Sequence, residues 1–294
     1  MGRKTDSVKK QNKKPGIRIV KILAVLFLAV CAVSFADWII EDGGTWNPDY
    51  PETDLSEIVS KSEWTEADYH TIFIQTGLAK DAADSIMEKK TISNRIKAFD
   101  KYQSDFFAPK KYTCMVDVVI VHDERLTDDE GNMRKGFEIA DLQDGDILIT
   151  KATHSLGWRH GHASIVTDAD EGETLEAVVL GQPTLFMNVS KWRTYPSFIQ
   201  LRLKDKSADP AKIAAYAKEK IQGVPYGLLT GIPVKAPENI KKTQCAHVVW
   251  YPFEHFGFDI DSDGSWLVTP KDIVNSDLLE VVQVYGVNPE EIWQ

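Results

Sequence analysis

The sequence predicts an α+β fold on three observations. Apolar residues recur at helical spacing through residues 64–107. From Met115 onward the pattern changes to short runs rich in Val and Ile that are separated by Gly, Asp and Pro, as in antiparallel strands. Two further helical patterns follow near residues 210–221 and 244–256. Because the strands succeed one another directly and these helices lie outside their run, we expect an antiparallel sheet with packed helices.

The first 40 residues carry a pattern typical of export. Residues 1–21 hold eight Lys and Arg against one Asp, a net charge of +7, and an uncharged apolar run follows at 22–36. A basic flank before a short apolar run is typical of a secretory signal peptide, and extension through residue 40 would give a membrane anchor. Either interpretation makes the rest of the chain extracytoplasmic, and an anchor would contact the membrane through residues 19–40. A buried core helix is the alternative.

The remainder divides into three parts. Residues 41–63 are rich in Gly, Pro and Asp and are predicted to be a linker. Residues 64–135 are predicted to form a helical cap region with one strand, in which Thr65 caps the first helix and Gly77 ends it. Residues 136–294 hold the other strands and helices. The strands are expected at 115–121, 146–150, 162–167, 174–180, 185–189, 198–203 and 278–285.

Composition restricts the class of protein. The hydrophobic share of 43% and the charged share of 27% are ordinary for a globular chain. The net charge of −10, which becomes −17 outside the basic flank, argues against a nucleic-acid partner. Three cysteines are too few for a disulfide scaffold. We expect Cys114 to lie in the core, with a disulfide to Cys245 as the alternative.

A histidine and a carboxylate fall on two strands predicted to form a hairpin. His162 begins one strand, and Glu176 lies in the next. In such a hairpin Glu176 lies opposite His162 or Ser164, and even-numbered residues share one face of the sheet. We therefore expect the two side chains to be neighbours. A carboxylate beside an imidazole holds one tautomer and favours the protonated ring.

A cysteine begins the helix expected over Gln244 to Phe256, with Thr243 as its cap. At a helix N-terminus, the dipole and the free N–H groups favour a thiolate and can bind a developing oxyanion. A thiol, a histidine and an orienting acid together compose a cysteine nucleophile triad. Cys245 is therefore the candidate nucleophile, and an inert buried thiol is the alternative.

Six short motifs between about residues 140 and 285 carry a resemblance to a known family. They are 142–148 (LQDGDIL), 161–166 (GHASIV), 175–177 (LEA), 224–227 (VPYG), 244–246 (QCA) and 268–273 (VTPKDI). With these motifs the chain resembles the YiiX/YaeF-like permuted papain-fold cysteine amidases, relatives of the NlpC-type cell-wall amidases. It departs from them at Ser164, where glycine is usual, and at Ala246 and His247, which replace a Ser-Glu pair.

The resemblance implies that residues 136–294 form a permuted papain-like catalytic domain, in which the histidine and the acid precede the cysteine. It implies His162 as general base, Glu176 as its orienting acid and Cys245 as nucleophile. The residues that we assign to the substrate or the oxyanion are Tyr226, Gln244 and Trp158.

The sequence thus predicts an extracytoplasmic thiol hydrolase that cleaves an amide bond through an acyl-enzyme, without cofactor or metal. Export makes a cell-wall peptide the natural substrate. A lipid-directed thioesterase or acyltransferase of the same fold is the first alternative, and a catalytically silent binding module is the second. A zinc hydrolase is disfavoured because no HExxH helix or paired cysteines support one. Its ligands would be His154, His160, His162 and His247.

Overall fold

The computed structural model of the chain describes residues 15–40, 44–89, 91–118, 121–155, 158–227 and 240–293. These residues belong to two units, one of residues 1–41 with 156–158 and one of residues 42–155 with 159–294. The first unit contains helix α1 (Pro15–Ile40). Across the described ranges, no helix combines the length and the apolarity that crossing a membrane requires. Residues 1–14, most of the predicted basic flank, lie outside the described residues.

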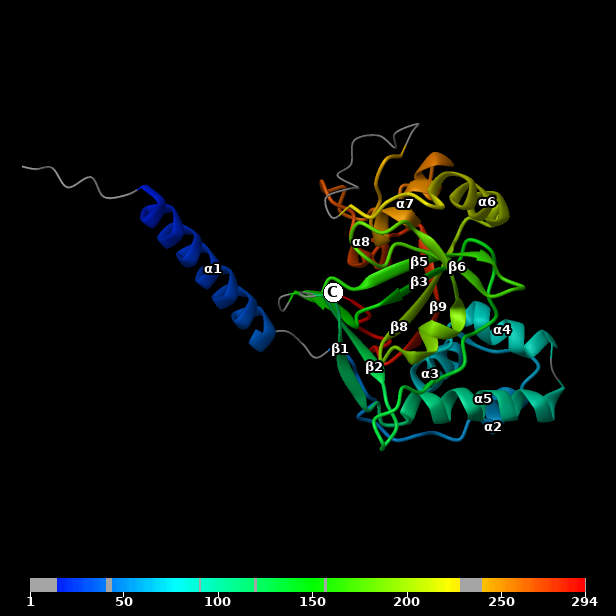
Figure 1. Cartoon of the computed structure of the whole chain (residues 1–294). Coiled ribbons are helices and arrows are strands. Elements are labelled where there is room, and N and C mark those ends of the chain that lie inside the picture. Colours follow the sequence, from blue (N-terminus) through cyan, green and yellow to red (C-terminus); the bar gives the residue numbers. More distant parts are fainter. Residues whose placement is uncertain are drawn as a thin grey trace, which may run out of the picture. The chain divides into compact units, whose positions relative to one another are not determined.

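The larger unit is built on a six-stranded sheet (Figure 1). The strand order is β7-β6-β5-β3-β8-β9, and every neighbouring pair is antiparallel. The strands are β3 (Ile147–Thr150), β5 (His162–Asp168), β6 (Glu173–Glu176), β7 (Leu185–Asn188), β8 (Phe198–Leu203) and β9 (Leu279–Tyr285). The predicted α+β class with antiparallel strands and packed helices is confirmed.

A second sheet has three strands in the order β1-β2-β4. They are β1 (Tyr112–Val118), β2 (Val121–Leu126) and β4 (Thr153–Ser155). The sequence predicts a strand at 115–121 but misses β2, because three successive charged residues interrupt its apolar pattern. In the structure these residues are buried in ion pairs. Arg125 Nη2 lies 2.8 Å from Asp123 Oδ2, and both Nη atoms of Arg159 lie 3.0 Å from the Glu124 carboxylate.

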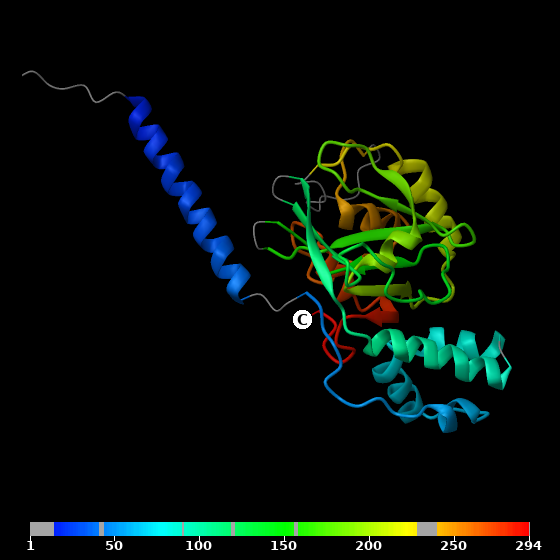
Figure 2. The same ribbon diagram turned by 60° about the horizontal axis from the view of Figure 1, so that its bottom comes forward.

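The helices form two groups in the larger unit, with α2–α5 together on one side and α6–α8 on another (Figures 1 and 2). They are α2 (Ser56–Ser60), α3 (Glu66–Thr76), α4 (Lys80–Lys89), α5 (Ile92–Phe107), α6 (Pro210–Ile221), α7 (Cys245–His255) and α8 (Pro270–Val274), and η1 (Val189–Thr194) is a 3-10 helix. The predicted ends of α3 are confirmed. Thr65 forms a capping box with Asp68, and Gly77 adopts φ 72°, where a Cβ would lie 2.0 Å from Val284 O.

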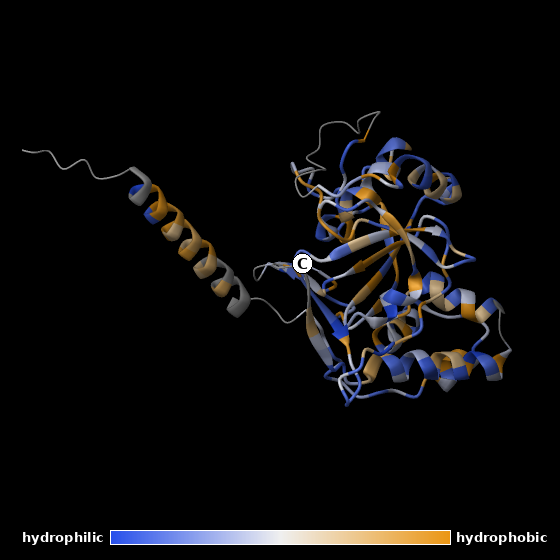
Figure 3. Cartoon of the chain, in the orientation of Figure 1, coloured by the Kyte–Doolittle hydropathy of each residue, from blue (hydrophilic) through white to orange (hydrophobic). Residues whose placement is uncertain are grey.

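Alternate residues of β5 face two different cores, as the two-residue period of a strand requires. Ala163 and Ile165 belong to the apolar cluster that includes the buried residues of α6 and α7. Val166 belongs to the opposite cluster, together with Trp192 of η1. The hydropathy colouring accordingly shows apolar strands in the middle of this unit (Figure 3). Helix α7 packs on β5 and β6, and its first residue, Cys245, acts on the imidazole of His162.

The helical region and the sheet share one core. Leu55, within the predicted linker 41–63, is buried in the same cluster as the apolar residues of α3–α5. Ala140 and Val282 of β9 belong to this cluster as well. The boundary that the sequence predicts between residues 135 and 136 therefore falls inside one compact unit, because Val282 of β9 packs in the same cluster as the apolar residues of these helices.

Candidate active site

The hairpin of β5 and β6 brings His162 and Glu176 together. Ile165 pairs with Leu175 in this hairpin, so the register places Glu176 opposite Ser164 and diagonal to His162. His162 Nε2 lies 2.8 Å from Glu176 Oε2, which is a hydrogen-bonding distance. The contact leaves Nδ1 as the ring nitrogen on the side away from the carboxylate.

Glu176 is fully buried, and four side chains share its carboxylate. Besides His162, Lys191 Nζ donates to Oε2 at 2.8 Å. On Oε1, Trp192 Nε1 donates at 3.0 Å and Thr174 Oγ1 at 2.9 Å. Burial raises the pKa of Glu176, but Lys191 and the hydrogen bond from His162 outweigh burial and hold this pKa well below its ordinary value. The site therefore contains a permanent buried anion.

His162 is held from three sides. Its ring stacks on that of Trp192, with centroids 5.5 Å apart and planes 12° from parallel. Burial lowers the pKa of His162, but hydrogen bonds with Cys245 and Glu176 outweigh burial and raise this pKa to about 9. At neutral pH the imidazole is therefore mostly protonated.

Cys245 is the first residue of α7 and is 7% exposed. An N–H at this position has no acceptor within its own helix, so it can donate to an anion, and the helix dipole acts in the same direction. The cap of α7 is Gln244, whose Oε1 accepts from Ala246 N at 2.8 Å. The prediction of Thr243 as the cap is wrong, because its hydroxyl bonds His247 Nδ1 at 3.0 Å.

The three residues assigned to the substrate or the oxyanion have different surroundings. Tyr226 forms a backbone bridge with Thr243. Burial raises the pKa of its phenol, and the charge of Cys245 raises it further, so Tyr226 stays neutral near Cys245. Gln244 uses its amide oxygen as the cap, and its Nε2 donates to Val268 O at 2.9 Å. Trp158 is 55% exposed and belongs with residues 1–41 to the other unit.

Sequence reasoning missed Lys191 and Trp192, the two η1 residues that hold the buried carboxylate. Neither lies in a motif, and their spacing from Glu176 follows no secondary-structure period. One signal was present, because a carboxylate expected beside a buried histidine needs a cation or several donors. The strand pattern alone could not indicate which cation supplies this contact.

The histidines considered as zinc ligands have separate partners. His160 Nε2 lies 2.8 Å from Ser155 Oγ, His162 bonds Glu176, and His247 bonds Thr243. Cys114 is exposed on β1, and its Sγ lies 3.6 Å from His154 Nε2. The expected core position of Cys114 is therefore wrong. All three cysteines are free thiols, so neither Cys114 nor Cys245 forms a disulfide.

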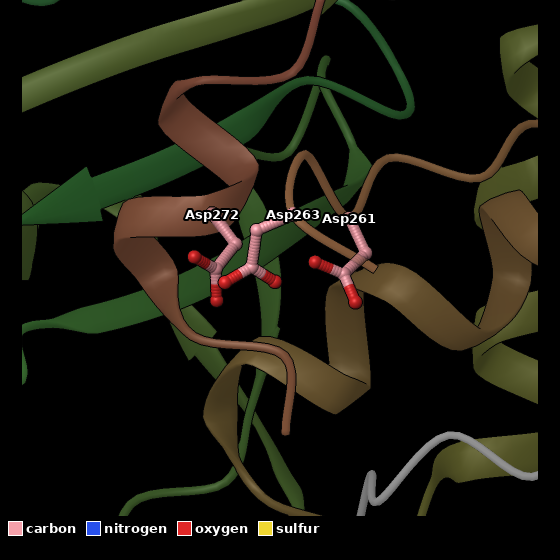
Figure 4. A group of neighbouring side chains, drawn as sticks. All are labelled: Asp261, Asp263 and Asp272. Carbon is pink, nitrogen blue, oxygen red and sulfur yellow. The ribbon is translucent and has the colours of Figure 1, made fainter. Parts of the chain in front are cut away.

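Within the described ranges, one group of carboxylates has the spacing of metal ligands (Figure 4). Oxygens of Asp261, Asp263 and Asp272 lie within 4.8 Å of one another. Burial, and then the charge of Asp272, raises the pKa of Asp261 to about 6. Carboxylates are ligands of the type that Ca²⁺ and Mg²⁺ prefer. An acidic loop that binds no ion would have the same close carboxylates and the same mutual repulsion, so the cluster by itself does not indicate a metal site.

Comparisons of the chain with protein-family models, with curated proteins and with solved structures find no match. The functional argument therefore depends on the geometry of the site. A thiol at a helix N-terminus, an imidazole beside it and a buried anion behind the imidazole can carry out nucleophilic attack on a carbonyl carbon.

Proposed function

We propose that the chain is an extracytoplasmic cysteine hydrolase that cleaves amide bonds. The observation that supports this most is the buried pair of His162 and Glu176, whose Nε2 and Oε2 lie 2.8 Å apart, with Cys245 acting on the same imidazole. A histidine held in this way has a fixed tautomer and a raised pKa. Both properties are what a thiolate nucleophile requires of its partner.

The reaction proceeds in two steps. The Cys245 thiolate attacks the amide carbonyl, and the backbone N–H groups at the start of α7 stabilise the oxyanion. The C–N bond then breaks, and Nδ1 of His162 gives its proton to the departing amine, which leaves a thioester on Cys245. A water molecule loses a proton to the now neutral His162 and attacks the thioester, which releases a carboxylic acid and restores the thiolate–imidazolium pair.

We further propose that the fold is a permuted papain-like one. In this chain the base and the acid come first, on β5 and β6, and the nucleophile follows on α7. Helix α7 packs on these two strands, which brings the three elements together. The same three roles would then be filled as in papain-like enzymes, but in the reverse order along the chain. The basic N-terminal flank supports export, and export supports a cell-wall peptide as substrate.

The test is hydrolysis by the full chain of a panel containing cell-wall stem peptides and acyl thioesters, with iodoacetamide labelling followed by intact mass. We expect amide cleavage and rapid labelling of Cys245. Cys245→Ser should reduce hydrolysis to the uncatalysed rate, and His162→Ala should reduce it by about 10²–10⁴-fold. Cys114→Ser, the matched thiol control, should retain full activity.

Each alternative has its own result in the same test. Cleavage of thioesters without cleavage of amides would indicate the acyl-directed enzyme instead. Absence of all hydrolysis, with Cys245 unreactive until the protein is unfolded, would leave the binding module. Hydrolysis that persists in Cys245→Ser contradicts the proposed nucleophile.

A further inference from the structure

The oxygen of Glu176 that accepts from His162 has a second cationic partner. Lys191 Nζ and His162 Nε2 each lie 2.8 Å from Oε2. The carboxylate side chain is 0% exposed, whereas the His162 and Lys191 side chains are 8% and 17% exposed. A carboxylate by itself is enough to hold an imidazole in one orientation. The second cation on the same buried oxygen therefore has a different role.

Apart from His162, the groups around this carboxylate come from three elements, η1, β6 and β7, and Lys191 is the cation among these groups. Besides Lys191, η1 contributes the neutral indole of Trp192, and β6 contributes the hydroxyl of Thr174. Met187 of β7 contacts Lys191 through its sulfur, at 3.6 Å. The other groups that act on His162 or Lys191 are the Cys245 thiol, the imidazole of His160 and the ring of Tyr195.

We propose that Lys191 is a positioning residue of the candidate site, which keeps the buried Glu176 carboxylate ion-paired while His162 is neutral. This inference rests on the proposed function, because it concerns the proton cycle of that reaction. Lys191 acts through Glu176 and His162 and does not itself need to touch the substrate.

The need for Lys191 follows from the proton balance. When His162 gives its proton to the departing amine, the charge on the imidazole disappears, but the charge on Glu176 stays buried. A buried anion that loses its ion partner is strongly destabilised. Without Lys191, the proton that remains on Nε2 of His162 would move to the carboxylate, and the ring would lose its anionic acceptor. With Lys191, the carboxylate remains charged and holds His162 through both steps.

Lys191 also limits how strongly His162 retains its proton. A neighbouring positive charge disfavours a second one, so Lys191 opposes the effect of Glu176 on His162. Removal of this charge should therefore raise the pKa of His162 further. Less neutral imidazole would then be present near pH 7.5 to accept a proton from water, and the hydrolysis of the acyl-enzyme would slow.

The experiment is an NMR titration of the His162 ring in the full chain, accompanied by the pH dependence of acyl-enzyme hydrolysis. Lys191→Met removes the charge, Lys191→Gln retains a donor without the charge, and Lys191→Arg retains the charge. The matched control is Lys218→Met, because Lys218 Nζ lies 2.7 Å from Glu173, a carboxylate on the same strand as Glu176. Circular dichroism checks that each variant folds.

The proposal expects Lys191→Met and Lys191→Gln to raise the midpoint of the His162 titration by about one pH unit or more, which is the low end for a neighbouring charge. Lys191→Arg and Lys218→Met should leave the midpoint unchanged. Acyl-enzyme hydrolysis at pH 7.5 should fall about tenfold and recover as the pH rises.

The result that overturns the proposal is a His162 midpoint that both neutral variants leave in place. A lower midpoint would overturn it as well. The titration needs no turnover, so it tests the role of Lys191 separately from the proposed function. If the proposed function fails, Cys245 forms no acyl-enzyme, but the Lys191 variants still shift the His162 midpoint.

Discussion

Replacement of Glu176 by glutamine should destabilise the protein in a manner that depends on pH. Glutamine keeps an oxygen for Trp192 and Thr174, which donate to Oε1. On the other side, its amide group would present N–H donors to His162 and Lys191, which are donors themselves. The substitution thus removes the buried anion and leaves two cations without their partner.

The magnitude follows from the pKa of His162, which rises from 6.5 to about 9 in the folded state. A group whose pKa is raised by folding stabilises the protein fully below its unfolded pKa, and this contribution is lost as the pH rises through the folded value. Here the contribution is on the order of 3 kcal/mol below about pH 6.5. The raised pKa of His162 and the lowered pKa of Glu176 both reflect the same ion pair, so this free energy is counted once for the pair.

The assay is urea unfolding of the full chain and of Glu176→Gln at pH 6, 7.5 and 9.5. We expect a loss of about 3–5 kcal/mol at pH 6, the range for breaking a buried ion pair. The loss should shrink toward pH 9.5, where His162 becomes neutral in the unaltered protein as well. The control is Glu173→Gln, whose partly exposed carboxylate pairs with Lys218 at 2.7 Å and should contribute under about 1 kcal/mol. A loss equal at pH 6 and 9.5, or equal to that of the control, would refute this reasoning.

Two further predictions concern single contacts. Trp192→Phe retains an aromatic ring against His162 but removes the indole donor to the buried carboxylate, so the free energy of unfolding should fall by about 1.5–3 kcal/mol. Trp250→Phe removes an indole that donates to the exposed Asp259, so its free energy of unfolding should fall by less in the same urea assay. Equal losses for the two variants would contradict the role assigned to burial. Asp261→Asn should stabilise the protein by about 1 kcal/mol at pH 7 after allowance for solvent screening, because a carboxyl whose pKa is raised to about 6 destabilises the fold once it ionises. This gain should vanish below about pH 4, the ordinary range of an aspartate. If Asp261→Asn is instead destabilising, and Ca²⁺ raises the melting temperature of the unaltered chain alone, the carboxylate group holds a cation and the repulsion argument is wrong.

Local patterns in the sequence were sufficient for several parts of the site. The position of Cys245 at a helix start follows from the helical period after it, and the structure has α7 begin at that residue. The two-residue period of strands puts His162 and Glu176 on one face, and the short turn between the strands restricts their register. These features depend on residues close together in the chain, where periodicity and turn chemistry are informative.

The tertiary structure alone decided which groups surround His162 and Glu176 and where polar residues are buried. Lys191 and Trp192 reach Glu176 from a 3-10 helix that no local period relates to β6. Glu124 of β2 is stable in the interior because Arg159, distant in the chain, pairs with it. In each case a polar group is stable in the interior through a partner supplied by another element. Such pairing is a property of how elements pack, so the sequence determined the candidate residues and the fold determined their electrostatics.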